Sequence, residues 1–275
     1  MDAVVSDPRI ATLLLCSRPP RPILVPNPLP REMIYRLIYW FKLLIADPNR
    51  DTWKLDKDLD NGLIRKDPTK EDDTKDPKWL FHYKPMTFWK LANEQGLDTS
   101  PYRKFINTCD AAVRVAKTSV EPIIHTLDEQ LPGYAFWRNF EASECVLRLI
   151  KDDPPAISHR LEVATKHTDF GFLTQHLFES RPHLVWFCEK TGEWIPIDFN
   201  NVDNQPAVLF FGRKASLMTG GKRCVENDGT QTKEVLPRSG LLEPLLHKVV
   251  EIGDMNELTT ARFAVVAFFH IPLVL

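Results

Sequence analysis

The amino-acid sequence predicts a mainly β protein, a sandwich or jelly roll that follows a helical segment. Two observations support this prediction. Apolar residues recur at helical spacing in two long stretches before residue 140, whereas many short apolar segments bounded by turn-forming residues follow it. The 275 residues are 43% hydrophobic, which is enough for a full core. We therefore expect a helical support over residues 1–140 and a β core over residues 141–275, forming one compact unit.

Helical spacing identifies the two long helices of the first half. Apolar residues three and four positions apart predict a helix over residues 31–45, which Asp47 and Pro48 should end. A longer set of the same kind predicts a second helix over residues 102–131. The proline-rich stretch over residues 17–30 is expected to be extended, with residues 23–25 as a short strand.

Two segments between these helices have opposite character. Residues 49–76 are densely charged, which favours a solvated loop. Residues 79–83, with the sequence WLFHY, break this polarity and should either pack in the core or approach a binding cleft.

The second half contains a series of short strand candidates, as expected for a sandwich or jelly roll. They cover residues 144–150, 161–164, 167–177, 184–188, 193–197, 207–211, 246–252 and 263–271. Metal ligands at one open end of such a barrel would be held rigidly, because strands position side chains better than loops do.

Composition excludes several function classes. A formal net charge of −2 and a pI of about 6.5 favour neither nucleic acid nor an anionic membrane as a partner. The five cysteines are scattered and lack a C-x-x-C pair, which argues against a disulfide framework and a structural zinc site. Because no signal sequence or membrane span is recognisable, we expect a cytoplasmic protein.

The sequence from Lys166 to Thr174, KHTDFGFLT, places an imidazole and a carboxylate two positions apart. In an extended strand, residues i and i+2 point to the same side, so His167 and Asp169 would face one point. A neutral imidazole and a carboxylate suit a first-row divalent ion, and a second histidine would complete a facial triad. An isolated H-x-D pair is more often two polar side chains on a surface strand, so the neighbouring motifs must show whether this pair binds a metal.

The order of motifs in the second half resembles that of the Fe(II)- and 2-oxoglutarate-dependent dioxygenases. The similarity is closest to the branch with isopenicillin N synthase, plant flavonoid oxygenases and the ethylene-forming enzyme. It covers about the last 130 residues and rests on the following segments: residues 147–150 (LRLI), 154–155 (PP), 167–174 (HTDFGFLT), 192–196 (GEWIP), 217–221 (LMTGG), 247–250 (HKVV) and 262–264 (RFA).

This resemblance implies a double-stranded β-helix, which is a jelly roll, and assigns roles by position. His167, Asp169 and His247 would be the Fe(II) ligands, and Arg262 would hold the distal carboxylate of the cosubstrate 2-oxoglutarate. The implied reaction converts 2-oxoglutarate and O₂ to succinate and CO₂ while a small-molecule substrate is oxidised, with hydroxylation as the expected outcome and secondary metabolism as the expected setting. Phe170, as well as Arg148 and His82, are candidates for substrate contact.

The chain departs from the family pattern near the cosubstrate. Ala264 stands where the family usually has a serine that assists the arginine, and residues of the segment Ile150-Lys151-Asp152 replace the usual asparagine and tyrosine. The affinity for 2-oxoglutarate therefore depends more heavily on Arg262. The remaining histidines, His176 among them, are expected to be hydrogen-bonded structural residues.

Two other functions stay open at this stage. A jelly roll without these helpers can bind a metal without turnover, and a zinc hydrolase can use the same three ligands to activate water. The polar segment between Gly221 and Leu245 is expected to run over the outside of the barrel, either as an inert excursion or as a lid with hinges at Gly229 and Gly240.

Overall fold

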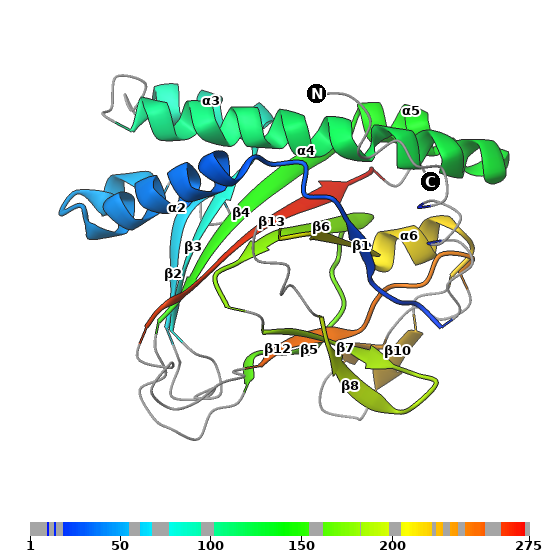
Figure 1. The fold of residues 1–275 in the computed structure, drawn as a ribbon. Coiled ribbons are helices and arrows are strands. Elements are labelled where there is room, and N and C mark those ends of the chain that lie inside the picture. The colour runs from blue at the N-terminus through cyan, green and yellow to red at the C-terminus, as the bar shows by residue number, and fades with distance from the viewer. Residues whose placement is uncertain are drawn as a thin grey trace.

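Two antiparallel sheets face each other, and a layer of helices covers the outer side of the larger one, as the computed structural model in Figure 1 shows. The larger sheet has the strand order β1-β9-β6-β13-β4-β3-β2, and the smaller has the order β5-β12-β7-β8. Strands β10 and β11 form a separate hairpin. The predicted jelly-roll architecture, mainly β with a helical support, is confirmed.

The described residues are 10, 14, 19–54, 61–67, 77–94, 102–153, 162–181, 183–197, 205–221, 224–227, 232–235, 240–250 and 260–272. The helices are α2 (Arg31–Ala46), η1 (Arg50–Trp53), α3 (Pro85–Glu94), α4 (Arg103–Gln130), η2 (Pro132–Tyr134), α5 (Phe136–Glu141) and α6 (Arg213–Met218). The strands of the larger sheet are β1 (Ile23–Val25), β2 (Gly62–Lys66), β3 (Lys78–Tyr83), β4 (Glu144–Asp152), β6 (Leu173–Glu179), β9 (Ala207–Phe211) and β13 (Arg262–His270). The remaining strands are β5 (Glu162–His167), β7 (Leu184–Cys188), β8 (Glu193–Pro196), β10 (Cys224–Asn227), β11 (Thr232–Val235) and β12 (His247–Val250).

Both predicted helices are present, and each buries its apolar stripe. Helix α2 buries Ile34, Leu37 and Phe41 on one face and ends at Ala46, with Asp47 as its C-cap, because the following Pro48 cannot continue the hydrogen-bond ladder. Helix α4 is 28 residues long and buries a stripe from Phe105 to Leu127. Both stripes belong to the hydrophobic core cluster that also contains the outward-facing side chains of the larger sheet.

Strand β13 runs through the middle of the larger sheet, between β4 and β6. Its side chains alternate between the helix layer and the space between the sheets: Val265 packs into the main core, whereas Val266 and Phe268 belong to a cluster on the inner face. A strand that is covered on both faces should be apolar throughout, which explains the continuous run from Phe263 to Phe269.

The predicted strand over residues 167–177 is wrong. Strand β5 ends at His167 in the smaller sheet, and β6 begins at Leu173 in the larger one. The chain must therefore cross between the sheets over residues 168–172, which form a connecting loop. At Gly171 a Cβ atom would lie 3.2 Å from the carbonyl oxygen of Phe269, so this crossing passes close to the backbone of β13.

The expectation of a solvated loop over residues 49–76 is also wrong in its described parts. Trp53 is buried, and β2 pairs with β3 at the edge of the larger sheet. The charged residues remain compatible with a strand because β2 is an edge strand, where charges discourage pairing with another chain. Arg65, for example, forms ion pairs with Asp67 and Asp153. Residues 55–60 and 68–76 lie outside the described residues.

Strands from both sides of residue 140 share the larger sheet, since β1, β2 and β3 join it from the first half. In the part of the chain that the structure describes, no helix combines the length and the apolar character that crossing a membrane requires.

Candidate metal centre and its pocket

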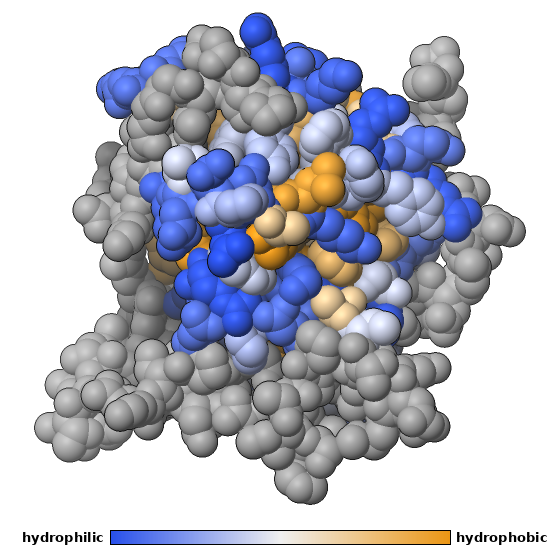
Figure 2. Space-filling model, turned by 90° about the vertical axis from the view of Figure 1, so that its left-hand side faces the viewer, coloured by the Kyte–Doolittle hydropathy of each residue, from blue (hydrophilic) through white to orange (hydrophobic). Residues whose placement is uncertain are grey.

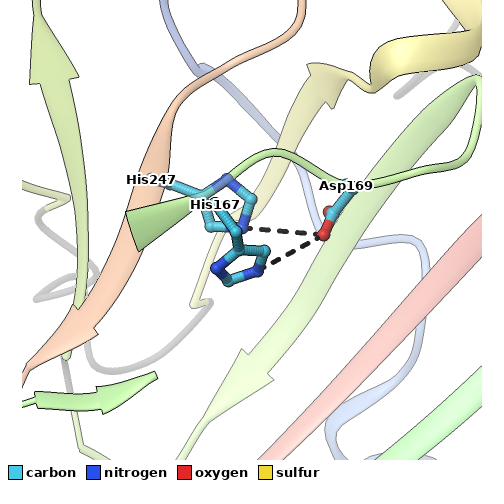
Figure 3. A group of neighbouring side chains, drawn as sticks. All are labelled: His167, Asp169 and His247. Atoms are coloured by element: carbon cyan, nitrogen blue, oxygen red, sulfur yellow. Dashed lines mark ion pairs between the residues drawn. The ribbon is translucent and has the colours of Figure 1, made fainter. Parts of the chain in front are cut away.

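His167, Asp169 and His247 converge between the two sheets, although only the histidines lie on strands (Figure 3). His167 is the last residue of β5, His247 is the first of β12, and the two are directly paired across these antiparallel strands. Asp169 comes from the connecting loop. Its Oδ1 atom lies 3.6 Å from Nε2 of His167 and 3.7 Å from Nε2 of His247. The three donor atoms all lie within 4.8 Å of one another, close enough to share one ion.

Backbone carbonyls orient both imidazoles. Nδ1 of His167 lies 2.7 Å from the carbonyl oxygen of Thr165, and Nδ1 of His247 lies 3.1 Å from that of Leu245. Since a carbonyl oxygen only accepts, each Nδ1 carries the proton and donates it there. Each Nε2 then presents its lone pair toward Asp169, which is the tautomer that a metal requires.

The loop that carries Asp169 is held by Thr174 and by the start of helix α6. Thr174 donates a hydrogen bond from Oγ1 to the second carboxylate oxygen, Oδ2, at 2.6 Å. The backbone N–H of Arg213, in the first turn of α6, donates to the carbonyl oxygen of Asp169 at 2.7 Å. A Cβ atom at Gly212 would lie only 2.3 Å from the carbonyl oxygen of Gly171, so this close approach of α6 to the loop requires glycine.

The protonation states also suit a metal. Burial raises the pKa of Asp169, but the charges that His247 and His167 carry when protonated outweigh it, so the pKa lies below its ordinary value. Burial lowers the pKa of His247 to about 4, although the Asp169 carboxylate opposes this shift. A neutral imidazole and an ionised carboxylate are the forms that bind a metal. Two imidazoles and one carboxylate are a ligand set that fits Fe(II).

The metal ligands lie in the wall of a cavity of about 520 Å³ between the sheets. Apolar side chains such as Leu80, Ile150 and Val266 line much of it, together with the cations Lys66, Lys78 and Arg148. Figure 2 shows the side of the molecule that lies to the left in Figure 1, where hydrophilic residues surround a small group of apolar ones. A cavity of this size can hold a small molecule and a cosubstrate.

Arg262 lines the same cavity, and two carboxylates hold its guanidinium. Nη1 donates to Oδ2 of Asp152 at 2.6 Å, and Nη2 donates to Oε1 of Glu179. All three residues are buried, with Arg262 2% exposed. Burial raises the pKa of Glu179, but Arg262 and His176 outweigh it and hold the pKa well below its ordinary value. Arg262 therefore lines the same cavity as the metal ligands, but it is already ion-paired.

The substrate candidates are in three different environments. Arg148 lines the cavity, with its guanidinium 4.6 Å from the ring centroid of Phe268. His82 on β3 is paired with Arg148 on β4, so both side chains point to the inner face of the sheet. However, His82 is only 1% exposed and is not one of the described residues that line the cavity. Phe170 is half exposed, and Arg213 and Lys214 contact the faces of its ring. Of the three, Arg148 is the side chain with direct access to the cavity.

Other histidines have structural partners, as the sequence predicts. Nε2 of His176 lies 3.0 Å from Glu179, and Nδ1 of His183 lies 2.6 Å from the carbonyl oxygen of Val250. Sequence reasoning gave no role to Thr174, Gly212 and Glu179, and it treated Asp152 only as a replacement for a family residue. For Thr174 a signal exists, because a hydroxyl close in sequence to a predicted ligand is a common outer partner of a metal site.

The segment between Gly221 and Leu245 is described in part. Strands β10 and β11 pair as an antiparallel hairpin. Gly240 is buried, and a Cβ atom there would lie 2.5 Å from the carbonyl oxygen of Ser216. This position is tightly packed, unlike a hinge. Gly229 and the other residues at 222–223, 228–231 and 236–239 lie outside the described residues.

Comparison with known proteins supplies the fold family. The structure is similar to that of the Arabidopsis thaliana dioxygenase for auxin oxidation 1, solved with 2-oxoglutarate, with a TM-score of 0.66 and 17% sequence identity. This match covers 92% of the present chain and 84% of the Arabidopsis chain. It is also similar to a full-length Neurospora crassa protein solved with α-ketoglutarate, with a TM-score of 0.68 and 14% sequence identity, over 96% of the present chain and 79% of the Neurospora chain. The chain has the fold of the Fe(II)/2-oxoglutarate oxygenases. JOX2, solved with 2-oxoglutarate, iron and JA, is similar at a TM-score of 0.68 and 13% identity, over 96% of this chain and 70% of JOX2. No family model and no curated protein matches the sequence.

A buried histidine, His183, and a partly buried one, His270, predict how stability depends on pH. Burial lowers the pKa of His183 and that of His270 to about 4, and the charges of Arg262 and Lys214 add to the respective shifts. Between an unfolded pKa of about 6.5 and this value, the unfolded chain binds more protons than the folded one. The free energy of unfolding should therefore fall as the pH decreases from about 6.5 to 4, with a slope of roughly 1 kcal/mol per pH unit for each histidine.

Urea denaturation at half-unit pH steps measures this dependence. His183→Asn is the matched variant, because an asparagine amide can keep the hydrogen bond to Val250 while it removes the titrating group. The variant should show a shallower decline between pH 6.5 and 4. A decline of equal slope in both proteins would contradict the assignment to His183.

Proposed function

We propose that this protein is a non-haem Fe(II)/2-oxoglutarate-dependent oxygenase that oxidises a small molecule, with hydroxylation as the expected reaction. The observation that carries the proposal is the convergence of His167, Asp169 and His247, with their Nε2 and carboxylate atoms directed at one point inside the cavity. The fold shared with oxygenases solved with 2-oxoglutarate supports the same function.

The roles of the residues follow from their positions. His167, Asp169 and His247 would hold Fe(II), and the carbonyls of Thr165 and Leu245 keep the imidazoles in the binding tautomer. Fe(II) bound there would mediate the four-electron reduction of O₂, for which two electrons come from the decarboxylation of 2-oxoglutarate to succinate and CO₂ and two from the substrate. The chain itself positions the substrate C–H bond and keeps water away with the apolar walls around Val266 and Phe268.

The cavity favours a small, partly apolar substrate with negative charge. Lys66, Lys78 and Arg148 line one side of it, so a carboxylate or phosphate would find cationic partners there. The Neurospora protein has also been solved with thymine, which is consistent with small molecules as substrates of this fold. A location in the cytoplasm remains the expectation from composition.

Two measurements test the proposal. Anaerobic addition of Fe(II) and then 2-oxoglutarate should produce a weak visible metal-to-ligand charge-transfer band. Addition of O₂ and ascorbate should then release succinate, slowly without substrate and faster with a suitable small anion. A folded, iron-loaded protein that gives neither band nor succinate would favour a metal-binding protein without turnover, and hydrolysis of an ester panel with zinc would favour the hydrolase.

A further inference from the structure

The pairing of strands places a row of four charged residues across the inner face of the larger sheet. Arg262 on β13 is opposite Asp152 on β4, which is opposite Lys78 on β3, which is opposite Lys66 on β2. Directly paired residues of antiparallel strands point to the same side, and all four line the cavity. Glu179 reaches Arg262 from β6 on its other side.

The two carboxylates that bind Arg262 differ in the hydrogen bonds that they accept from other groups. Oε2 of Glu179 accepts hydrogen bonds from the backbone N–H groups of His183, at 2.8 Å, and Leu184, at 3.3 Å. Its Oε1 lies 3.0 Å from Nε2 of His176 and accepts from Arg262. Glu179 is thus fixed at both oxygens.

Asp152 is bound to Arg262 through Oδ2 only. Its Oδ1 atom is buried and accepts no hydrogen bond from the described residues, with Nζ of Lys78 3.8 Å away. Asp152 lines the cavity, whereas Glu179 is not one of the described residues that do. Of the two carboxylates, Asp152 is therefore the one that a ligand in the cavity can replace.

The charges around Arg262 determine how a ligand carboxylate could replace Asp152. Arg262 carries one positive charge and already faces two buried carboxylates. A third carboxylate cannot join them without like-charge repulsion in a site of low dielectric constant. It can take the place of Asp152 on Nη1, provided that Asp152 turns away, and Lys78 is close enough to receive the displaced carboxylate.

We propose that Asp152 acts as a built-in competitor of the cosubstrate's distal carboxylate for Arg262. Asp152 thereby weakens the binding of dicarboxylate 2-oxo acids and leaves the binding of monocarboxylate 2-oxo acids unaffected. This inference rests on the proposed function, because it concerns the cosubstrate of the same site. It identifies Asp152, which lies two residues before the Pro154-Pro155 motif, as a residue that determines cosubstrate specificity.

The test is an equilibrium titration of the Fe(II)-loaded protein without O₂, by calorimetry and by the charge-transfer band. Two ligands of equal chain length are compared: 2-oxoglutarate and 2-oxovalerate, which lacks the distal carboxylate. Asp152→Asn keeps the size of the side chain and removes its charge. It should tighten 2-oxoglutarate binding at least about tenfold, since like-charge juxtaposition is strongly unfavourable in a buried site. Binding of 2-oxovalerate should change by less than about twofold, because that ligand makes no contact with Arg262.

Glu179→Gln is the matched control, because it removes the same charge from the other side of Arg262. It should tighten 2-oxoglutarate binding much less than Asp152→Asn does, because it relieves only part of the like-charge repulsion and leaves Asp152 in place on Nη1 of Arg262. Asp152→Ala serves as a second variant if the asparagine variant is poorly folded by circular dichroism, and the same tightening is expected of it.

Three results would overturn the inference. Unchanged or weaker 2-oxoglutarate binding in folded Asp152 variants would show that Asp152 does not compete. Equal tightening of both ligands would show a general effect on the cavity. If neither the natural protein nor the variants bind any 2-oxo acid, both this inference and the proposed function are wrong. If the variants bind 2-oxoglutarate without any tightening, only this inference is wrong and the proposed function stands.

Discussion

Replacing Asp169 by alanine is expected to abolish oxygenase turnover and to weaken Fe(II) binding by more than about 100-fold, the upper range seen when even an outer partner of a metal ligand is lost. Asp169 is the anion of the ligand set, and its Oδ1 lies between the Nε2 atoms of His167 and His247. Without it, two neutral imidazoles remain, and they bind a divalent ion in water weakly.

The measurement is a competition titration of Fe(II) under anaerobic conditions, with circular dichroism as the control for folding. Thr174→Val is a graded comparison, because it removes the hydrogen bond to Oδ2 of Asp169 and keeps the ligand itself. Its Fe(II) affinity should fall by roughly 10–100-fold, the effect typical of an outer-shell partner. Unchanged Fe(II) affinity in a folded Asp169→Ala protein would contradict the assigned ligand set.

Arg262→Ala is expected to destabilise the fold by about 3–5 kcal/mol, the usual cost of leaving buried carboxylates without their cation. Asp152 and Glu179 would both remain in a buried site without the cation that they share. The sequence alone predicts only a higher 2-oxoglutarate requirement for this variant. The ion pairs add a loss of stability that does not depend on any cosubstrate.

The control is a double-mutant cycle with Glu179→Gln, measured by urea denaturation at pH 7. If the pair is coupled, the double variant should recover part of the stability that Arg262→Ala loses. In the natural protein, the lowered pKa of Glu179 contributes stability that is present above its unfolded pKa and is lost as the pH falls below about 4.5. Arg262→Ala should remove that contribution. Additive losses in the cycle would argue against a direct pair.

Much of the fold could be predicted from the sequence, because its signals are local. The apolar spacing within residues 31–45 and 102–131 is a property of a single helix, and it marks helices α2 and α4 to within one residue at each end. The prediction failed for residues 167–177, because this mixed polar and apolar segment is compatible with one strand or with two strands and a crossing. Only the assignment of β5 and β6 to different sheets distinguishes these alternatives.

The sequence by itself determined the chemical types of the metal ligands and their order along the chain, from His167 to His247. Tertiary structure decided how those side chains meet: Asp169 reaches the histidines from a loop rather than from their strand, held by Thr174 and by the first turn of α6. It also decided that Arg262 meets Asp152, 110 residues away, and Glu179, 83 residues away. The physical reason is strand register, which fixes which side chains are opposite one another and arises from the packing of the whole sheet rather than from any segment of the chain.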